Sequence, residues 1–141
     1  MENITIKINN REVQAKPGST ILEAATAAGI KIPTLCYLKD FTGTGACRVC
    51  MVEVKGARSL VASCVYPVSE GMDIFTNSQK ALDARRNTVE LILSNHSKNC
   101  LSCARNTTCE LQELSYTVGA RDDVFAGAKT TPTFDDWSTG I

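Results

Sequence analysis

Apolar and polar residues alternate at the start of the chain with the period expected of strands. Residues 3–8 read Asn-Ile-Thr-Ile-Lys-Ile, which predicts a half-buried strand. A turn then lets residues 12–15 return as the second strand of a hairpin. Residues 21–28 place isoleucine, leucine and alanine at helical spacing, and Ser19 or Thr20 can cap that helix. This part of the chain therefore predicts a hairpin and a short helix that packs closely on it.

A long segment without periodicity follows. Residues 31–50 contain proline and several glycines, which predicts a loop, and long loops inside compact domains are usually functional. Residues 51–54 and 60–62 then predict a second hairpin, and residues 74–76 a last short strand. This order of elements predicts an α+β fold, in which a small sheet clasps one helix.

The pattern becomes helical after residue 77. Residues 78–94 predict a helix with a broad apolar side, capped by Ser78. Arg85 and Arg86 are expected on its solvated face. A second helix is predicted to start near Thr107, where the sequence Thr-Thr-Cys-Glu has the spacing of a capping box.

The composition gives no support to some classes of function. The chain has 141 residues, enough for one domain or two small lobes. Its 15 basic and 15 acidic residues cancel, so it carries no electrostatic footprint for nucleic acid. The N-terminus lacks the apolar core of a signal peptide, and no apolar run approaches the roughly 20 residues that span a bilayer. These features predict a cytoplasmic protein that does not insert into a membrane.

All the cysteines and the only histidine fall into two groups of four candidate metal ligands. The first group is Cys36, Cys47, Cys50 and Cys64, and the second is His96, Cys100, Cys103 and Cys109. An odd number of cysteines with Cys-x-x-Cys spacing is a poor disulfide framework and favours metal binding in a reducing compartment. Thiolates bind zinc and iron–sulfur clusters, and imidazole binds zinc and iron. The residue types therefore predict a metal carrier.

The first group surrounds a glycine-rich loop. Three of its cysteines lie on residues 36–50, and Cys64 arrives from a neighbouring strand. Glycine lets backbone N–H groups approach the sulfurs of a cluster. A structural zinc site usually pairs two Cys-x-x-Cys-like knuckles, whereas this group has one. The spacing therefore favours a 2Fe–2S cluster over zinc.

The second group is more compact along the chain. Three residues separate His96 from Cys100, two separate Cys100 from Cys103, and five separate Cys103 from Cys109. Cys109 is expected in the first turn of its helix, where free N–H groups and the helix dipole favour a thiolate. Chemistry and spacing leave a Cys₃His zinc site and an iron–sulfur cluster both open. No catalytic residue is predicted, because the only histidine stands among these cysteines.

These motifs resemble a known family. Residues 32–37, 45–53 and 62–64 read Ile-Pro-Thr-Leu-Cys-Tyr, Gly-Ala-Cys-Arg-Val-Cys-Met-Val-Glu and Ala-Ser-Cys. With the pattern His-x₃-Cys-x₂-Cys-x₅-Cys-Glu-Leu-Gln from residue 96, they resemble the N-terminal iron–sulfur region of iron-only hydrogenases and of the large iron–sulfur subunit of complex I. The resemblance implies a β-grasp, ferredoxin-like lobe with a 2Fe–2S cluster on the first group. It also implies a small helical lobe with a His/Cys₃-ligated 4Fe–4S cluster on the second.

We therefore predict a 2Fe–2S ferredoxin-like domain over residues 1–77, a helical 4Fe–4S domain over 78–118 and an extended, poorly packed tail over 119–141. The resemblance implies single-electron relay between a flavoprotein or NAD(P)H-linked partner and another redox subunit, in a hydrogenase-, formate dehydrogenase- or complex I-like assembly. The chain has no phosphate-binding loop and no further cysteines for an active-site cluster, so it is expected to be a non-catalytic subunit of a hetero-oligomer. The alternatives are a zinc-binding interaction module and a free soluble ferredoxin.

Overall fold

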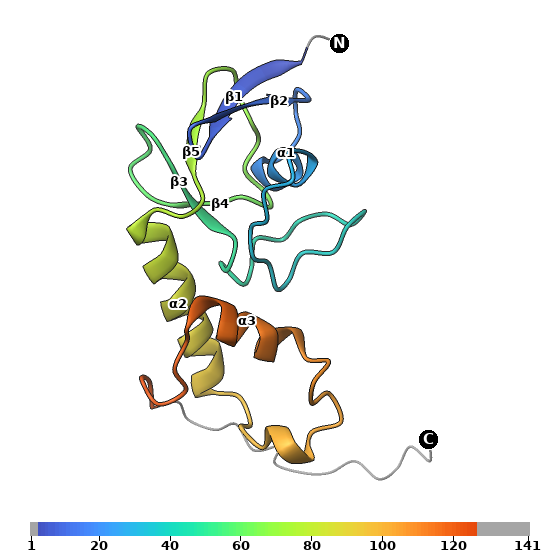
Figure 1. Ribbon diagram of the computed structural model, residues 1–141, viewed down its shortest axis with the longest axis vertical. Coiled ribbons are helices and arrows are strands. Elements are labelled where there is room, and N and C mark those ends of the chain that lie inside the picture. The colour runs from blue at the N-terminus through green and yellow to red at the C-terminus, as the bar shows by residue number, and fades with distance from the viewer. Residues whose placement is uncertain (1–2, 127–141) are drawn as a thin grey trace.

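The computed structural model describes residues 3–126, and in this range a mixed sheet stands above a pair of crossed helices (Figure 1). The sheet has the strand order β2-β1-β5-β3-β4. Strands β1 and β5 are parallel, and the other neighbours are antiparallel. The strands are β1 (Ile4–Ile8), β2 (Arg11–Ala15), β3 (Met51–Val54), β4 (Val61–Ala62) and β5 (Asp73–Phe75). The predicted α+β class is confirmed.

The first hairpin follows directly from its turn residues. Asn9 and Asn10 both have positive φ, at 51° and 64°, and Ile8 pairs with Arg11. A two-residue turn of this kind matches the twist of antiparallel strands, and asparagine tolerates the left-handed region better than most residues. The alternation of the sequence then buries Ile6 and Ile8 on one face.

Helix α1 (Ile21–Ala27) lies across the sheet and closes its core. Of the two candidate caps, Thr20 is the one used: its hydroxyl accepts from the N–H of Glu23, whose carboxylate accepts from the N–H of Thr20. This reciprocal pair is a capping box. The buried face of the helix is short and rich in alanine, so it approaches the strands closely. Helix and sheet together form the larger of two cores.

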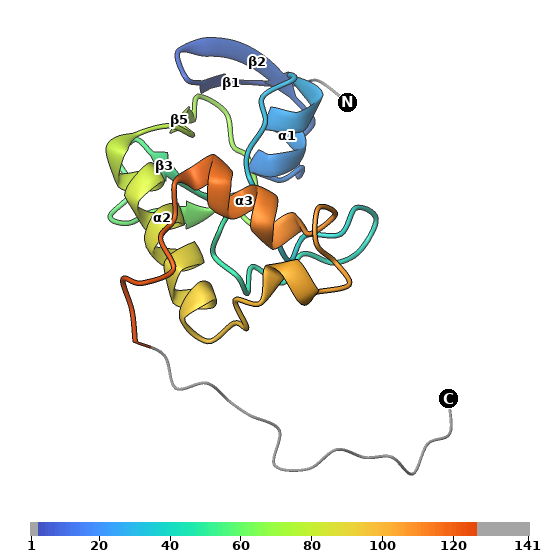
Figure 2. The same ribbon diagram turned by 60° about the horizontal axis from the view of Figure 1, so that its bottom comes forward.

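Helix α2 (Gln79–Ser94) leaves the sheet and carries the second part of the molecule. Ser78 caps it, as predicted, by accepting from the N–H of Ala81. A 3₁₀ turn, η1 (Cys100–Ser102), and helix α3 (Glu110–Val118) follow, and α3 packs across α2 (Figures 1 and 2). A small second core of Val49, Val89 and Leu114 joins the cysteine-rich loop to both helices.

Three details of the sequence analysis are wrong. Arg85 is only 4% exposed, because the buried face of α2 runs through Ala81, Arg85 and Val89. Helix α3 begins at Glu110, so Cys109 occupies its N-cap position instead of its first turn. The predicted capping box is not formed, since Thr107 has a φ of +68° and lies outside the helix.

No helix within residues 3–126 is both long and apolar enough to cross a bilayer. The predicted tail begins at residue 119, and its residues 127–141 lie outside the described part of the chain.

Candidate metal centres

The first cysteine group is assembled by the long loop between α1 and β3. Cys36, Cys47 and Cys50 lie on this loop, and Cys64 follows β4. Cys50 and Cys64 are 2% and 3% exposed, whereas Cys36 and Cys47 are half-buried. The N–H of Cys47 donates to Sγ of Cys36 over 3.5 Å, and the thiol of Cys50 lies near enough to Cys64 to contribute to the raised pKa of Cys64. The four thiols thus form two adjacent pairs.

Backbone amides of the loop point at these sulfurs. The N–H of Cys47 donates to Cys36, and the amides of Ala46, Val49 and Gly45 lower the pKa values of Cys36, Cys47 and Cys64, respectively. Such an array of N–H groups is a backbone anion site, suited to thiolates and to the negative charge of a metal–thiolate group.

The loop reaches this conformation through close backbone approach and positive φ angles. A Cβ on Gly43 would meet the carbonyl oxygen of Cys64 at 2.7 Å, which no side chain tolerates. Gly45 and Arg48 both have a φ of +59°, and in Arg48 this is the left-handed conformation of a non-glycine residue. The glycines are therefore required by the packing of the sulfur loop against Cys64.

The thiol pKa values follow from burial and from these donors. The N–H of Cys47 lowers the pKa of Cys36, because it stabilises the thiolate. Burial raises the pKa of Cys64 to about 11, with further contributions from the thiol and charge of Cys50. Burial also raises the pKa of Cys47. A metal bound here must displace protons from buried thiols, so its binding releases protons.

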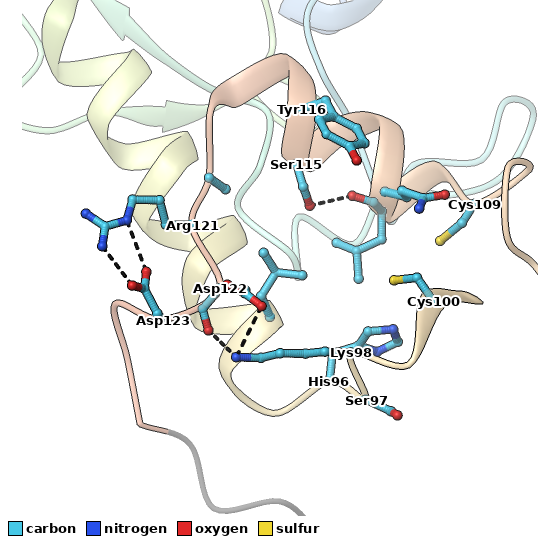
Figure 3. Close-up of a pocket in the computed structure, with 14 residues that line it drawn as sticks. His96, Ser97, Lys98, Cys100, Cys109, Ser115, Tyr116, Arg121, Asp122 and Asp123 are labelled. Carbon is cyan, nitrogen blue, oxygen red and sulfur yellow. Dashed lines mark hydrogen bonds and ion pairs between the residues drawn. The ribbon is translucent and has the colours of Figure 1, made fainter. Parts of the chain in front are cut away.

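The second group lies around an open cavity of about 610 Å³ below α3 (Figure 3). His96 follows α2, Cys100 is the first residue of η1, and Cys109 occupies the N-cap position of α3; all three line the cavity. Figure 3 shows the sulfurs of Cys100 and Cys109 turned toward one another. Cys103 is exposed, is not part of this lining, and accepts from the N–H of Arg105 over 3.4 Å. The structure thus brings three of the four predicted residues to one cavity.

The arrangement of the candidate ligands can be compared with what a zinc ion and an iron–sulfur cluster each require. Within residues 3–126, no three His, Cys, Asp or Glu side chains gather tightly enough to hold a single metal ion. A 2Fe–2S cluster instead needs two ligands on each of two irons, and the pairs Cys36–Cys47 and Cys50–Cys64 fit that need. The first group therefore fits a 2Fe–2S cluster better than one zinc ion.

The two groups approach each other along α2. A second open cavity of about 600 Å³ is lined by Cys47 and Arg48 on one side and by Ile92 and His96 on the other. Val49, between Cys47 and Cys50, is fully buried against Val89 and Leu114. Sequence reasoning missed Val49, because an apolar residue between two cysteines has no period that shows which way it points.

A mixed sheet that clasps one helix, with cysteines and amides gathered on its loop, defines a 2Fe–2S ferredoxin-like protein. The chain belongs to the family described as 2Fe-2S iron-sulfur cluster binding domain, whose model matches residues 1–79. Residues 85–123 match a second family model, the NADH-ubiquinone oxidoreductase-G iron-sulfur binding region. The resemblance seen in the sequence motifs is confirmed.

Two relatives that contain a similar region are longer proteins. The chain is 42% identical over 146 aligned positions to the NADP-reducing hydrogenase subunit HndD of Solidesulfovibrio fructosivorans, covering 100% of this chain and 25% of that one. It is 36% identical to the mitochondrial NADH-ubiquinone oxidoreductase 78 kDa subunit of Candida albicans, covering 85% of this chain and 17% of the relative. Both relatives are subunits of oxidoreductases, and the chain spans a quarter or less of their length.

A solved structure shares both the fold and the sequence. The crystal structure of an NAD+-reducing [NiFe]-hydrogenase in the H2-reduced state superposes with a TM-score of 0.85 at 31% identity. The match covers 92% of this chain and 54% of that chain. It therefore extends over the sheet, the sulfur loop and the helical part together.

Proposed function

We propose that this chain is an electron-transfer iron–sulfur subunit that holds one 2Fe–2S cluster and one 4Fe–4S cluster. Residues 1–77 would hold one 2Fe–2S cluster through Cys36, Cys47, Cys50 and Cys64. Residues 78–118 would hold one 4Fe–4S cluster through His96, Cys100, Cys103 and Cys109, ahead of a tail over 119–141. The observation that carries the proposal is the pairing of four thiols under a set of backbone N–H donors.

When bound, the two clusters supply one-electron redox chemistry, and the chain supplies ligation, orientation and tuning. Backbone N–H groups near the sulfurs of Cys36, Cys47 and Cys64 stabilise negative charge on these sulfurs, so they would favour the reduced state of the cluster. The core of Val49, Val89 and Leu114 fixes the sulfur loop to the helices that bear the second group. The chain thus holds two electron sites at a fixed separation.

The partners we propose follow from the relatives. An NAD(P)H-linked flavoprotein and further iron–sulfur subunits would exchange electrons with this chain in a cytoplasmic hetero-oligomer, and the chain would not catalyse a reaction alone. Size-exclusion chromatography of native extract tests this proposal: elution at the mass of the free chain would favour a soluble ferredoxin. The alternative is an interaction module in which the same cysteines and histidine bind zinc instead of iron–sulfur clusters.

Anaerobic purification decides between iron and zinc. We expect a brown protein with iron and acid-labile sulfide in the amounts that one 2Fe–2S and one 4Fe–4S cluster require. Electron paramagnetic resonance (EPR) after reduction should show two distinct signals. A colourless protein with stoichiometric zinc and no sulfide would overturn the proposal.

Single ligand variants assign each cluster to its residues. Cys50→Ser should abolish the 2Fe–2S signal alone, and Cys103→Ser should impair the 4Fe–4S signal alone. His96→Cys should lower the midpoint potential of the 4Fe–4S cluster, because a thiolate adds negative charge where imidazole is neutral. An unchanged midpoint for both clusters in His96→Cys would remove His96 from the ligand set.

A further inference from the structure

Arg85 is a buried cation beside the first cysteine group. Its residue exposure is 4%, whereas the side chain of its neighbour Arg86 is 47% exposed. Arginine is rarely buried without a paired anion. No carboxylate within residues 3–126 forms an ion pair with Arg85. Its charge therefore lacks a counter-charge among the described protein groups.

Neutral backbone acceptors hold the Arg85 guanidinium in place. Nη2 donates to the carbonyl oxygen of Thr76 over 2.6 Å and to that of Met51 over 2.9 Å. Met51 follows Cys50 directly, so the cation is anchored one residue from a proposed ligand. The buried Nε has no hydrogen-bond partner among the described residues. This arrangement fixes the position of the charge without neutralising it.

Arg85 interacts electrostatically with Cys50. Burial lowers the pKa of Arg85, and the charge of the Cys50 thiolate acts in the opposite direction and raises it. A guanidinium nevertheless stays protonated in proteins. A buried charge is costly unless an opposite charge lies near it. Thiolate ligands around iron give a site negative charge, and reduction adds one more electron to that charge.

We propose that Arg85 is a positioning residue that raises the reduction potential of the 2Fe–2S cluster by holding a permanent positive charge beside Cys50. This inference rests on the proposed function. The charge stabilises the reduced state more than the oxidised state, because the reduced state is more negative. The same contacts attach α2 to the start of β3 and to the end of β5, so the helix and the electrostatic field are set together.

The test is a potentiometric titration of the anaerobic, cluster-loaded protein, monitored by EPR so that each cluster is read separately. Arg85→Gln removes the charge and keeps a shorter, polar side chain; Arg85→Met removes both the charge and the hydrogen-bond donors. Both should lower the 2Fe–2S midpoint and leave the 4Fe–4S midpoint unchanged. Arg86→Gln removes the same charge from the exposed face of the same helix and is the matched control, with both midpoints unchanged.

The outcomes separate this inference from the proposed function. Wild-type protein without a 2Fe–2S signal would overturn the proposed function. A loaded Arg85→Gln protein with the wild-type midpoint would overturn only the role of Arg85. If both neutral variants lose the 2Fe–2S cluster, Arg85→Lys decides, because it keeps the charge without the planar guanidinium. A loaded Arg85→Lys protein supports the charge, and one that also loses the cluster shows a purely structural role and overturns the inference.

Discussion

The two cysteine groups differ in how much of each site the polypeptide builds by itself. In the first group, Cys50 and Cys64 are buried, and backbone N–H groups point at the sulfurs. In the second group, Cys100 and Cys103 are exposed, and Cys100 lines an open cavity. The first site is continuous with the core of the sheet, because Cys50 and Cys64 belong to that core. The second site lies at the C-terminal end of α2 and the N-terminal end of α3.

This contrast indicates that one set of candidate ligands is held in place by the fold, whereas the other would be ordered only when a metal binds. Between the end of α2 and the start of α3, no residue is buried and η1 is the one regular element. Such a segment has little apolar burial to offset its conformational entropy, so a metal bound there as proposed would contribute to its folding. In the first loop, by contrast, Val49 and Cys50 are buried in the two cores, so part of that loop is held by packing without a metal.

Removing the metal should produce the largest difference between the two regions. We expect residues 96–109 to lose hydrogen-exchange protection completely in chelated, reduced protein, whereas β1 and β3 keep theirs. Mass-spectrometric hydrogen exchange of loaded and metal-free protein measures both regions in one sample. Slow exchange of residues 96–109 in the metal-free state would show that the second site is preorganised too.

Gly43→Ala should damage the preorganised site and spare the other. The new Cβ would meet the carbonyl oxygen of Cys64 at 2.7 Å, so the sulfur loop must shift at a cost of about 1–3 kcal/mol. The 2Fe–2S content, measured by EPR and iron analysis, should fall while the 4Fe–4S content stays. Gly71→Ala is the control, because its Cβ would enter open space at a strained φ of +75°. Equal loss in both variants would mean that general instability, not the loop, is responsible.

The sequence predicts the elements better than it predicts their junction. Strand alternation, Ser78 as a cap and the two ligand groups depend on local patterns, and local patterns can be read from a chain. Arg85 was expected in solvent because charged residues usually are. Its burial depends on Met51 and Thr76, carbonyl groups brought near by the sheet. Thr107 was expected as a cap, but its φ of +68° and the start of α3 at Glu110 place it outside the helix.

Leu114→Ala tests whether the two regions share one core. Leu114 is 7% exposed and packs with Val49 and Val89, so its truncation should cost about 2–4 kcal/mol. Native-state hydrogen exchange should show this loss in α2 and α3 and, to a smaller degree, in the sulfur loop. Leu91→Ala, at a position 55% exposed on α2, should cost less than about 1 kcal/mol. Unchanged protection of the loop around Val49 in Leu114→Ala would show that the two regions are energetically independent.

Thr20→Ala should give the smallest effect, and one confined to the preorganised region. The capping box of α1 has two hydrogen bonds, of 2.7 and 3.2 Å, whereas the cap of α2 has one, from the N–H of Ala81 to Ser78, of 3.3 Å. Loss of an N-cap costs about 1 kcal/mol, so Thr20→Ala should lower the protection of α1 by about that amount and Ser78→Ala by less. Because α1 contacts the sheet core and not the second group, residues 96–109 should exchange as in the parent protein. Faster exchange of residues 96–109 in Thr20→Ala would mean that the sheet and the second site are energetically coupled through α2 and unfold as one unit.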